Sequence, residues 1–298
     1  MKKASILAAV LLIAVGLALC AGAFYAVGFD FTRFDTTAYE ANTYPISETV
    51  QRIEIEGGEA DIALAPFADG GVRVVCMEGE HVRYQVWTEA GTLRISEPGK
   101  RAWYTYLIPF SKDLRMTVYL PAGEYEALRI NGRTGDVEIP DAFSFGSLAV
   151  RLSTGDIGIR GLHAGEMELS VSTGDISANA VVCDGDLAIS VSTGDAELTE
   201  VTCRRFVSTG STGSIKLADV VASEDLSIER STGDVRFDDC DAAQIRVKTS
   251  TGSVRGTLRS EKTFVTKTST GSVSVPENVS GGRCEITTTT GDIRITLA

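Results

Sequence analysis

The chain has 298 residues, of which 43% are hydrophobic and 30 are glycine, and its formal net charge is −12. Such acidity disfavours binding to nucleic acids and anionic polymers, and mildly favours cations or basic partners. The length fits a membrane segment followed by one elongated domain, or by a cap and a repeat domain.

Residues 1–29 are predicted to form a transmembrane anchor. Lys2 and Lys3 precede an apolar run from Ala4 to Phe29 that only Ser5 interrupts. As a helix this run would be about 39 Å long, enough to cross a bilayer with some tilt. The two lysines favour an N-terminus inside the cell and a chain that continues outside.

Two alternatives remain for this segment. Ala21-Gly22-Ala23 resembles a signal-peptidase site, so the segment could be a cleaved leader. Leu17-Ala18-Leu19-Cys20 faintly resembles a lipoprotein box, although Leu19 is large for the position before the cysteine.

Between the anchor and the repeats we expect a polar juxtamembrane segment at 30–50 and an N-terminal β cap at 51–130. The cap region alternates apolar and polar residues between turn signals such as Gly57-Gly58 and Ala90-Gly91. The aromatic-rich stretch 101–110 is read as a loop closing the core, with a carbohydrate-stacking patch as the alternative.

Residues 131–298 repeat a Thr-Gly-Asp or Thr-Gly-Ser motif with a period of 19 or 20 residues, which indicates a repeat architecture. We assign the motif's last two residues as structural turn residues. They are Gly135, Asp136, Gly155, Asp156, Gly174, Asp175, Gly194, Asp195, Gly213, Ser214, Gly233, Asp234, Gly252, Ser253, Gly271, Ser272, Gly291 and Asp292.

Apolar residues flank each turn at every second position, which is the pattern of half-buried strands and not of a helix. Equivalent positions keep the same character in nearly every copy. The sequence therefore predicts an all-β fold, a right-handed parallel β-solenoid of about nine coils of about 20 residues each.

A family resemblance becomes visible at Tyr119-Leu120-Pro121-Ala122-Gly123, which leads into the Thr-Gly-Asp coils from Arg133 onward. The chain resembles a bacterial putative-adhesin family of surface β-solenoids of unknown function. The resemblance implies an extracytoplasmic envelope protein, and some members resemble accessory proteins of envelope-stress systems. It implies no catalytic or ligand-binding residue.

The acidic turn residues have two possible roles, which are binding a cation and capping the turn. Stacked carboxylates about 5 Å apart repel one another unless they are hydrogen-bonded or bridged by a cation such as Ca²⁺. Because serine replaces aspartate in three of the nine copies and serine caps turns well, capping is the preferred reading. No cofactor or metal is expected.

Catalysis is not expected. The chain has two histidines, His81 and His163, without metal-ligand spacing or a nucleophile motif. Coils that vary by one residue leave no long loop for the acids and bases of a β-helix glycan-degrading enzyme, which stays the enzymatic alternative.

The position three residues after the turn glycine drifts from small or acidic to basic along the chain. This stripe, including Lys216, Arg236, Arg255 and Arg294, could meet an acidic partner or form a solvated face of mixed charge. We thus expect a single-pass membrane protein whose extracytoplasmic part binds a protein or glycan ligand or acts as a scaffold. An envelope-stress sensor is the second alternative.

Two further expectations concern the core and the C-terminus. Cys183, Cys203, Cys240 and Cys284 fall at inward positions and should be buried small hydrophobes, with Cys183 and Cys203 in adjacent coils within reach of a disulfide.

The strand at 293–297 should end the stack and expose its core. We therefore expect it to be covered by a return of the chain, by a partner or by end-to-end self-association.

Overall fold

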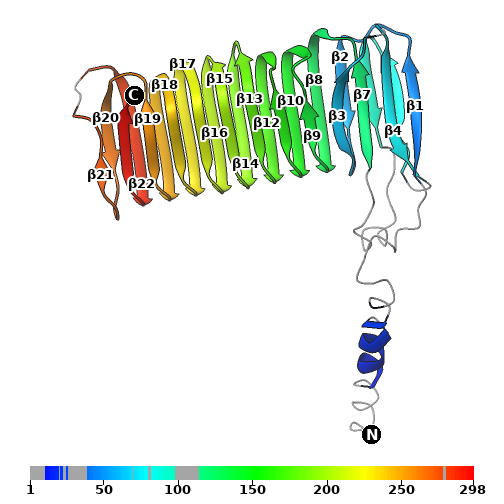
Figure 1. Cartoon of the computed structure of the whole chain (residues 1–298), viewed down its shortest axis with the longest axis horizontal. Helices are drawn as coiled ribbons and strands as arrows, with labels where there is room; N and C mark the ends of the chain where they lie inside the picture. The colour runs from blue at the N-terminus through cyan, green and yellow to red at the C-terminus, as the bar shows by residue number, and fades with distance from the viewer. Residues whose placement is uncertain are drawn as a thin grey trace.

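The computed structural model is all-β, with strands stacked side by side along one axis (Figure 1). The residues that it describes are 11–19, 21–22, 25, 39–68, 70–79, 82–97, 114–277 and 280–298. The predicted parallel β-solenoid is confirmed, because equivalent strands of successive coils pair in parallel and in register, as Ile157 does with Ile176. The handedness of the coil stays a prediction.

Strands of the solenoid form two walls. In spatial order the first wall contains β5 (Gln85–Glu89), β6 (Thr92–Ser96), β2 (Arg52–Glu56), β8 (Gly123–Thr134), β10 (Phe143–Thr154), β12 (His163–Thr173), β14 (Asp186–Thr193), β16 (Arg205–Thr212), the second halves of β17 (Ile215–Thr232) and β18 (Val235–Thr251), then β22 (Gly282–Thr290) and β20 (Lys262–Lys267).

The second wall follows each turn. In spatial order it contains β1 (Glu40–Ile46), β4 (Val72–Glu78), β7 (Arg115–Leu120), β3 (Asp61–Pro66), β9 (Val137–Ile139), β11 (Ile157–Arg160), β13 (Ile176–Cys183), β15 (Ala196–Cys203), the first halves of β17 and β18, then β19 (Val254–Leu258), β23 (Ile293–Leu297) and β21 (Val273–Ser274).

The alternating apolar positions of both walls form one continuous core. Side chains such as Val150, Leu169 and Ile189 are stacked in one inward column and almost fully buried. Burying one such side chain contributes about 1.5–3 kcal/mol. Each added coil is therefore stabilised by the apolar side chains that it buries.

The region 51–130 extends the solenoid beyond the recognised repeats. β2 and β3 form one coil and β6 and β7 another, and both coils pair in parallel with their neighbours. Among the described strands the antiparallel pairs are β1–β4, β4–β7 and β5–β6, all at the N-terminal end of the stack. The aromatic stretch at 101–110 lies outside the described residues.

A buried carboxylate fastens β1 to this end. Glu78 accepts hydrogen bonds from the Tyr44 hydroxyl at 2.7 Å, the Asn42 amide at 2.6 Å and the Tyr84 N–H at 2.8 Å. Burial of Tyr44, together with its hydrogen bond to Glu78, raises the pKa of the tyrosine to about 12.

Coils at both ends of the solenoid are stacked out of chain order. At the N-terminal end, β2 and β3 lie between the later coil β6/β7 and the coil β8/β9. At the C-terminal end, β22 and β23 lie between β18/β19 and the earlier strands β20/β21. In Figure 1 the C-terminus accordingly lies inside the stack, with β20 and β21 beyond it.

The expectation that the strand at 293–297 ends the stack is therefore wrong, whereas the expectation that this strand is covered is confirmed. Ile293 and Ile295 are 1% and 2% exposed, because β20 and β21 cover them. The outermost coil is instead β20/β21, where Val265 and Val273 are each 44% exposed. The covering strands come from the same chain, so burial of Ile293 and Ile295 needs no partner.

The N-terminal segment is described only in part. Residues 11–19, 21–22 and 25 are helical, and the remainder of the predicted anchor at 1–29, including Cys20, lies outside the described residues. In the part of the chain that is described, no helix combines the length and the apolar character needed to cross a bilayer. The anchor stays a prediction.

Candidate binding surfaces on the solenoid

All nine turn motifs lie in one column along the solenoid edge between the two walls. Eight of the nine turn glycines, all except Gly271 in the outermost coil, donate their N–H to the carbonyl of the threonine that precedes the turn in the adjacent coil, as Gly155 does to Thr173 at 3.0 Å. At Gly174 φ is 135°, and a Cβ would lie 2.1 Å from the carbonyl oxygen of Gly155. Glycine is required there both by the left-handed backbone and by the close approach of the adjacent coil.

The acidic residues of the column bind the neighbouring coils together. The Oδ1 atom of Asp136 accepts the backbone N–H of Asp156 at 2.8 Å, and Asp156 and Asp175 do the same for the next coil at 2.7 Å. Where serine replaces aspartate, its hydroxyl takes the same place, as Ser214 Oγ does for the Asp234 N–H at 3.3 Å. The structure thus gives these carboxylates a capping role between coils.

The end of the column follows the exchanged coil order. Asp292 accepts both the N–H and the hydroxyl of Ser272 at 2.9 Å, and these two bonds lower the pKa of its carboxyl group. Among the described residues, no group of three or more His, Cys, Asp or Glu side chains is placed to hold a metal ion.

One further member of this column has no Thr-Gly-Asp motif. Asp61 Oδ1 accepts the N–H of Asp136 at 3.0 Å, so the coil β2/β3 carries the same cap. Ala60 stands where the motif has glycine. The signal was the Ala-Asp-Ile series at 60–62, which keeps the aspartate and the apolar residue after it.

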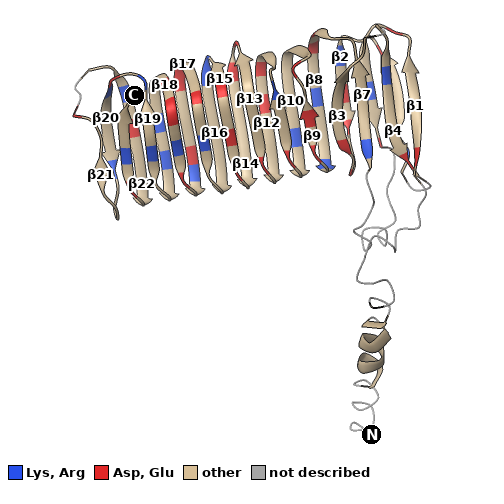
Figure 2. Cartoon of the chain, viewed as in Figure 1, with Lys and Arg blue, Asp and Glu red and all other residues tan. Residues whose placement is uncertain are grey.

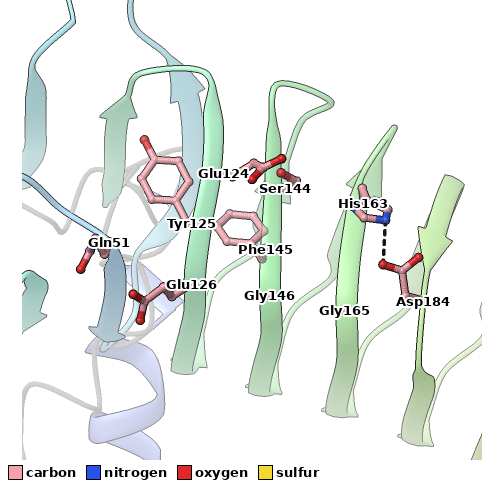
Figure 3. A pocket seen from close by; sticks show the side chains of 10 residues that line it. All are labelled: Gln51, Glu124, Tyr125, Glu126, Ser144, Phe145, Gly146, His163, Gly165 and Asp184. Atoms are coloured by element: carbon pink, nitrogen blue, oxygen red, sulfur yellow. Dashed lines mark ion pairs between the residues drawn. The ribbon is translucent and has the colours of Figure 1, made fainter.

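A furrow of about 430 Å³ crosses the opposite corner of the solenoid (Figure 3). Its floor is formed by Gly146 and Gly165 in adjacent coils, where a Cβ on Gly165 would lie 2.4 Å from the carbonyl oxygen of Gly146. Together with Gly185 these residues form a second glycine column with the same period of 19 or 20, which was the overlooked sequence signal. The other lining residues are Gln51, Glu124, Tyr125, Glu126, Ser144, Phe145, His163 and Asp184.

Acidic and aromatic side chains dominate the furrow. Tyr125 and Phe145 lie on the neighbouring strands β8 and β10 with ring centroids 5.9 Å apart, and both are almost fully buried. Glu126 is paired with Arg52. Since the rings belong to the core, the furrow offers carboxylates and glycine backbone to a ligand but no exposed stacking platform.

Ser144, His163 and Asp184 occupy three successive coils in this furrow. Ser144 and His163 are register partners, and His163 Nε2 lies 3.1 Å from Asp184 Oδ2. This is the set of groups that serine hydrolases use. The side chains of His163 and Asp184 are 53% and 67% exposed, whereas an activating pair must be held rigid and shielded from water. The arrangement is that of a solvated ion pair.

A basic row lies on the second wall near the C-terminal end. Over this part of the solenoid Figure 2 shows Lys and Arg interspersed with Asp and Glu. The row is formed by Lys216, Arg236, Arg255 and Arg294, which are register partners in four adjacent coils and are all exposed. In the sequence Ser274 interrupts the series between Arg255 and Arg294. In space Ser274 lies at the end of the row, because β23 is inserted before β21.

The core contains one buried arginine near the middle of the solenoid. Arg230 is 2% exposed and donates to Ser208 Oγ at 3.0 Å and to the carbonyl of Val191 at 3.4 Å. Burial lowers the pKa of its guanidinium group. Gly210 leaves the space for this side chain, because a Cβ there would lie 1.8 Å from Arg230 Nη1. Ser208 and Gly210 therefore accommodate Arg230 at positions where the two preceding coils carry apolar residues, namely Leu169, Val171, Ile189 and Val191.

The cysteines lie where the sequence analysis placed them. Cys183, Cys203, Cys240 and Cys284 are buried, as is Cys76 in the N-terminal region, which confirms their inward assignment. Burial raises the pKa of the Cys203 and Cys284 thiols to about 12. All five thiols are free, and a raised pKa disfavours the reactive thiolate at neutral pH.

The family described as Toastrack DUF4097 matches residues 50–205 and 184–298, which together cover the solenoid from β2 to its C-terminal end. The chain belongs to the Toastrack family. This confirms the resemblance stated from the repeats, since solved structures similar to the chain include a protein described as a putative adhesin. No match was found among proteins with curated functions.

Two solved structures are similar to this Toastrack chain over most of their length. A putative adhesin from Parabacteroides merdae is 11% identical, with 87% of this chain and 96% of that chain covered and a TM-score of 0.53. A putative lipid binding protein from Parabacteroides distasonis is 15% identical, with 86% and 97% covered and a TM-score of 0.50. At these identities the likeness shows the shared fold alone.

Proposed function

We propose that this Toastrack protein is a non-catalytic binding or scaffold protein of the bacterial envelope, held by its N-terminal segment with the solenoid outside the cell. The observation that carries the proposal is the use of the repeated polar residues. Asp136, Asp156 and Asp175 are all engaged in holding adjacent coils together. The repeated polar residues therefore stabilise the stack of coils, and the open surface of the solenoid is left to bind a ligand.

The shape of that surface favours binding over catalysis. From β8 onward the described strands are joined by short connections, and the furrow and the basic row both extend along the solenoid axis. Such surfaces suit a long ligand or a partner protein, whereas catalysis requires groups held in a closed, water-poor site. The names of the adhesin-like neighbours support this reading without identifying a ligand.

The proposal is tested by presenting the full chain, in detergent, to arrays of envelope glycans and proteins. We expect saturable binding that heat denaturation abolishes, and no change in the mass of any bound glycan. Cleavage of a glycan by the wild-type chain, lost in the His163→Ala variant, would instead establish the hydrolase reading of the furrow.

A further inference from the structure

We infer that the basic row formed by Lys216, Arg236, Arg255 and Arg294 is a binding site for a linear polyanion that carries phosphate groups along its length. This inference rests on the proposed binding function and names the class of ligand. Adjacent members of the row are separated by one strand spacing, about 4.8 Å, so the row extends about 15 Å along the solenoid axis.

The net charge of −12, which disfavours a polyanion, conceals an uneven distribution. Residues 40–203 contain 12 Lys and Arg against 26 Asp and Glu, whereas residues 204–298 contain 13 against 12. The excess negative charge thus belongs to the N-terminal coils. Local potential, and not the total charge, determines where a flexible anion binds on an elongated molecule, since charges beyond about 10 Å are screened.

Two of the four cations lack an ion-pair partner among the described residues, namely Arg236 and Arg294. Lys216 pairs with Glu197, and Arg255 lies 3.4 Å from Asp292 Oδ2. Asp292 in turn is already bonded to Ser272. The row therefore retains exposed guanidinium groups whose donors are available to phosphate oxygens.

Hydroxyl groups flank the C-terminal half of the row. Ser253 and Thr257 lie on the coil of Arg255, Thr296 follows Arg294 on β23, and Ser274 pairs with Arg294 on β21. Arginine together with serine and threonine hydroxyls supplies the donors that phosphate groups accept.

The basic row is one residue wide, which favours a linear polymer over a planar membrane as its ligand. Asp234 and Asp292 border the row on one side and Asp238 on the other, so the positive charge is confined to a single file. A planar anionic membrane would meet these carboxylates as well as the arginines. A linear polymer can follow the row without approaching them closely.

The experiment titrates the full chain with fluorescent long-chain inorganic polyphosphate at several salt concentrations. The wild type should bind with an affinity that falls steeply with salt, and tripolyphosphate should bind more weakly because it spans fewer cations. The double variant Arg255→Gln/Arg294→Gln should lose about tenfold in affinity and show a shallower salt dependence. The matched control Lys248→Gln/Lys267→Gln removes two exposed cations from the opposite wall and should change affinity less than about twofold.

Three results would overturn the inference. They are the absence of binding at low salt, an equal loss in both double variants, and equal or stronger arginine-dependent binding to vesicles containing anionic phospholipid, which would indicate a membrane surface. If an array ligand binds equally well to the wild type and to Arg255→Gln/Arg294→Gln, the proposed binding function stands and only the assignment of the row fails.

Discussion

Arg255 and Arg294 lie side by side on adjacent parallel strands, although 38 residues separate them in the chain and a complete coil intervenes. Their contact results from the insertion of β23 between β19 and β21. The same insertion buries the C-terminal strand and makes the basic row continuous. Coil order is thus the feature on which both the closure of the solenoid and its candidate binding surface depend.

The carboxylates of the turn column should contribute to stability as caps. Replacement of Asp156 by alanine removes the acceptor of the Asp175 N–H and should lower the free energy of unfolding by about 1 kcal/mol. Asp156→Asn keeps a side-chain acceptor and serves as the control, with a smaller loss. The check is urea denaturation of both variants, and an alanine variant as stable as the wild type would refute the capping role.

The outermost coil should be held by a buried ion pair that responds to pH. Lys262, whose side chain is 4% exposed, donates to Asp241 Oδ1 at 2.7 Å. Burial alone would raise the pKa of Asp241, but hydrogen bonds from Lys262 and Ser260 outweigh it and lower the pKa below 3.8. A depressed carboxyl pKa stabilises the fold above the unfolded-state value, and that contribution is lost as the pH falls through the folded-state value.

We therefore expect Asp241→Asn to reduce stability at pH 7 by about 2 kcal/mol, because it leaves the Lys262 charge buried without an anion. The difference from the wild type should shrink as the pH falls below about 3.8. Denaturation followed at pH 7 and pH 3 measures both quantities. A difference that is the same at the two pH values would contradict the assigned pair.

Replacing the buried Arg230 by an apolar residue should not destabilise the solenoid. Arg230→Met removes a buried charge without emptying the space beside Gly210, so stability should stay equal or rise by about 1–2 kcal/mol. Ser208→Ala should destabilise the wild type by about 1 kcal/mol by removing the 3.0 Å hydrogen bond, but not the Arg230→Met variant. Equal effects of Ser208→Ala in the two backgrounds would show that the bond contributes nothing.

Replacing a strained corner residue by glycine should stabilise the fold. Ala180, Glu200, Asp219 and Asp239 have φ between 52° and 55°, and Gly161 occupies the equivalent corner with φ 60°. Left-handed backbone costs a residue with a Cβ about 1 kcal/mol, partly offset by the greater unfolded-state entropy of glycine. Ala180→Gly should raise the thermal unfolding midpoint, whereas the control Ala188→Gly, in the extended strand β14, should lower it. A lower midpoint for Ala180→Gly would show that the corner is not strained.

The repeated part of the fold could be predicted from the sequence because every coil carries the same pattern of residues. Gly135 through Gly291 share a backbone conformation that only glycine adopts readily, and the inward columns carry apolar residues that only a stacked coil can bury. The coil around Asp61 escaped recognition because alanine replaces glycine at position 60. A single alanine in place of the turn glycine is enough for a motif search to overlook the coil, although the hydrogen bond between the coils still forms.

Coil order could not be predicted in the same way. Every coil presents nearly the same apolar columns and the same backbone edge, so β23 satisfies β19 as well as β21 would. The apolar columns therefore do not distinguish the exchanged order from the chain order, and the pattern that predicts a coil carries no information on its place in the stack. For the same reason the sequence showed a basic stripe interrupted by Ser274, and only the spatial order shows it to be continuous.

Disulfide trapping tests the exchanged coil order most directly. In a full chain carrying Cys20→Ser, the pair Arg255→Cys/Arg294→Cys places two exposed cysteines on adjacent strands, about 4.8 Å apart at Cα and within disulfide reach. The pair Arg255→Cys/Ser274→Cys lies two strands apart, about 10 Å, which is too far. We predict that mild oxidation followed by peptide mass spectrometry finds the 255–294 disulfide and not the 255–274 disulfide. The reverse result would mean that the coils stack in chain order, and it would contradict both the buried C-terminus and the continuous basic row.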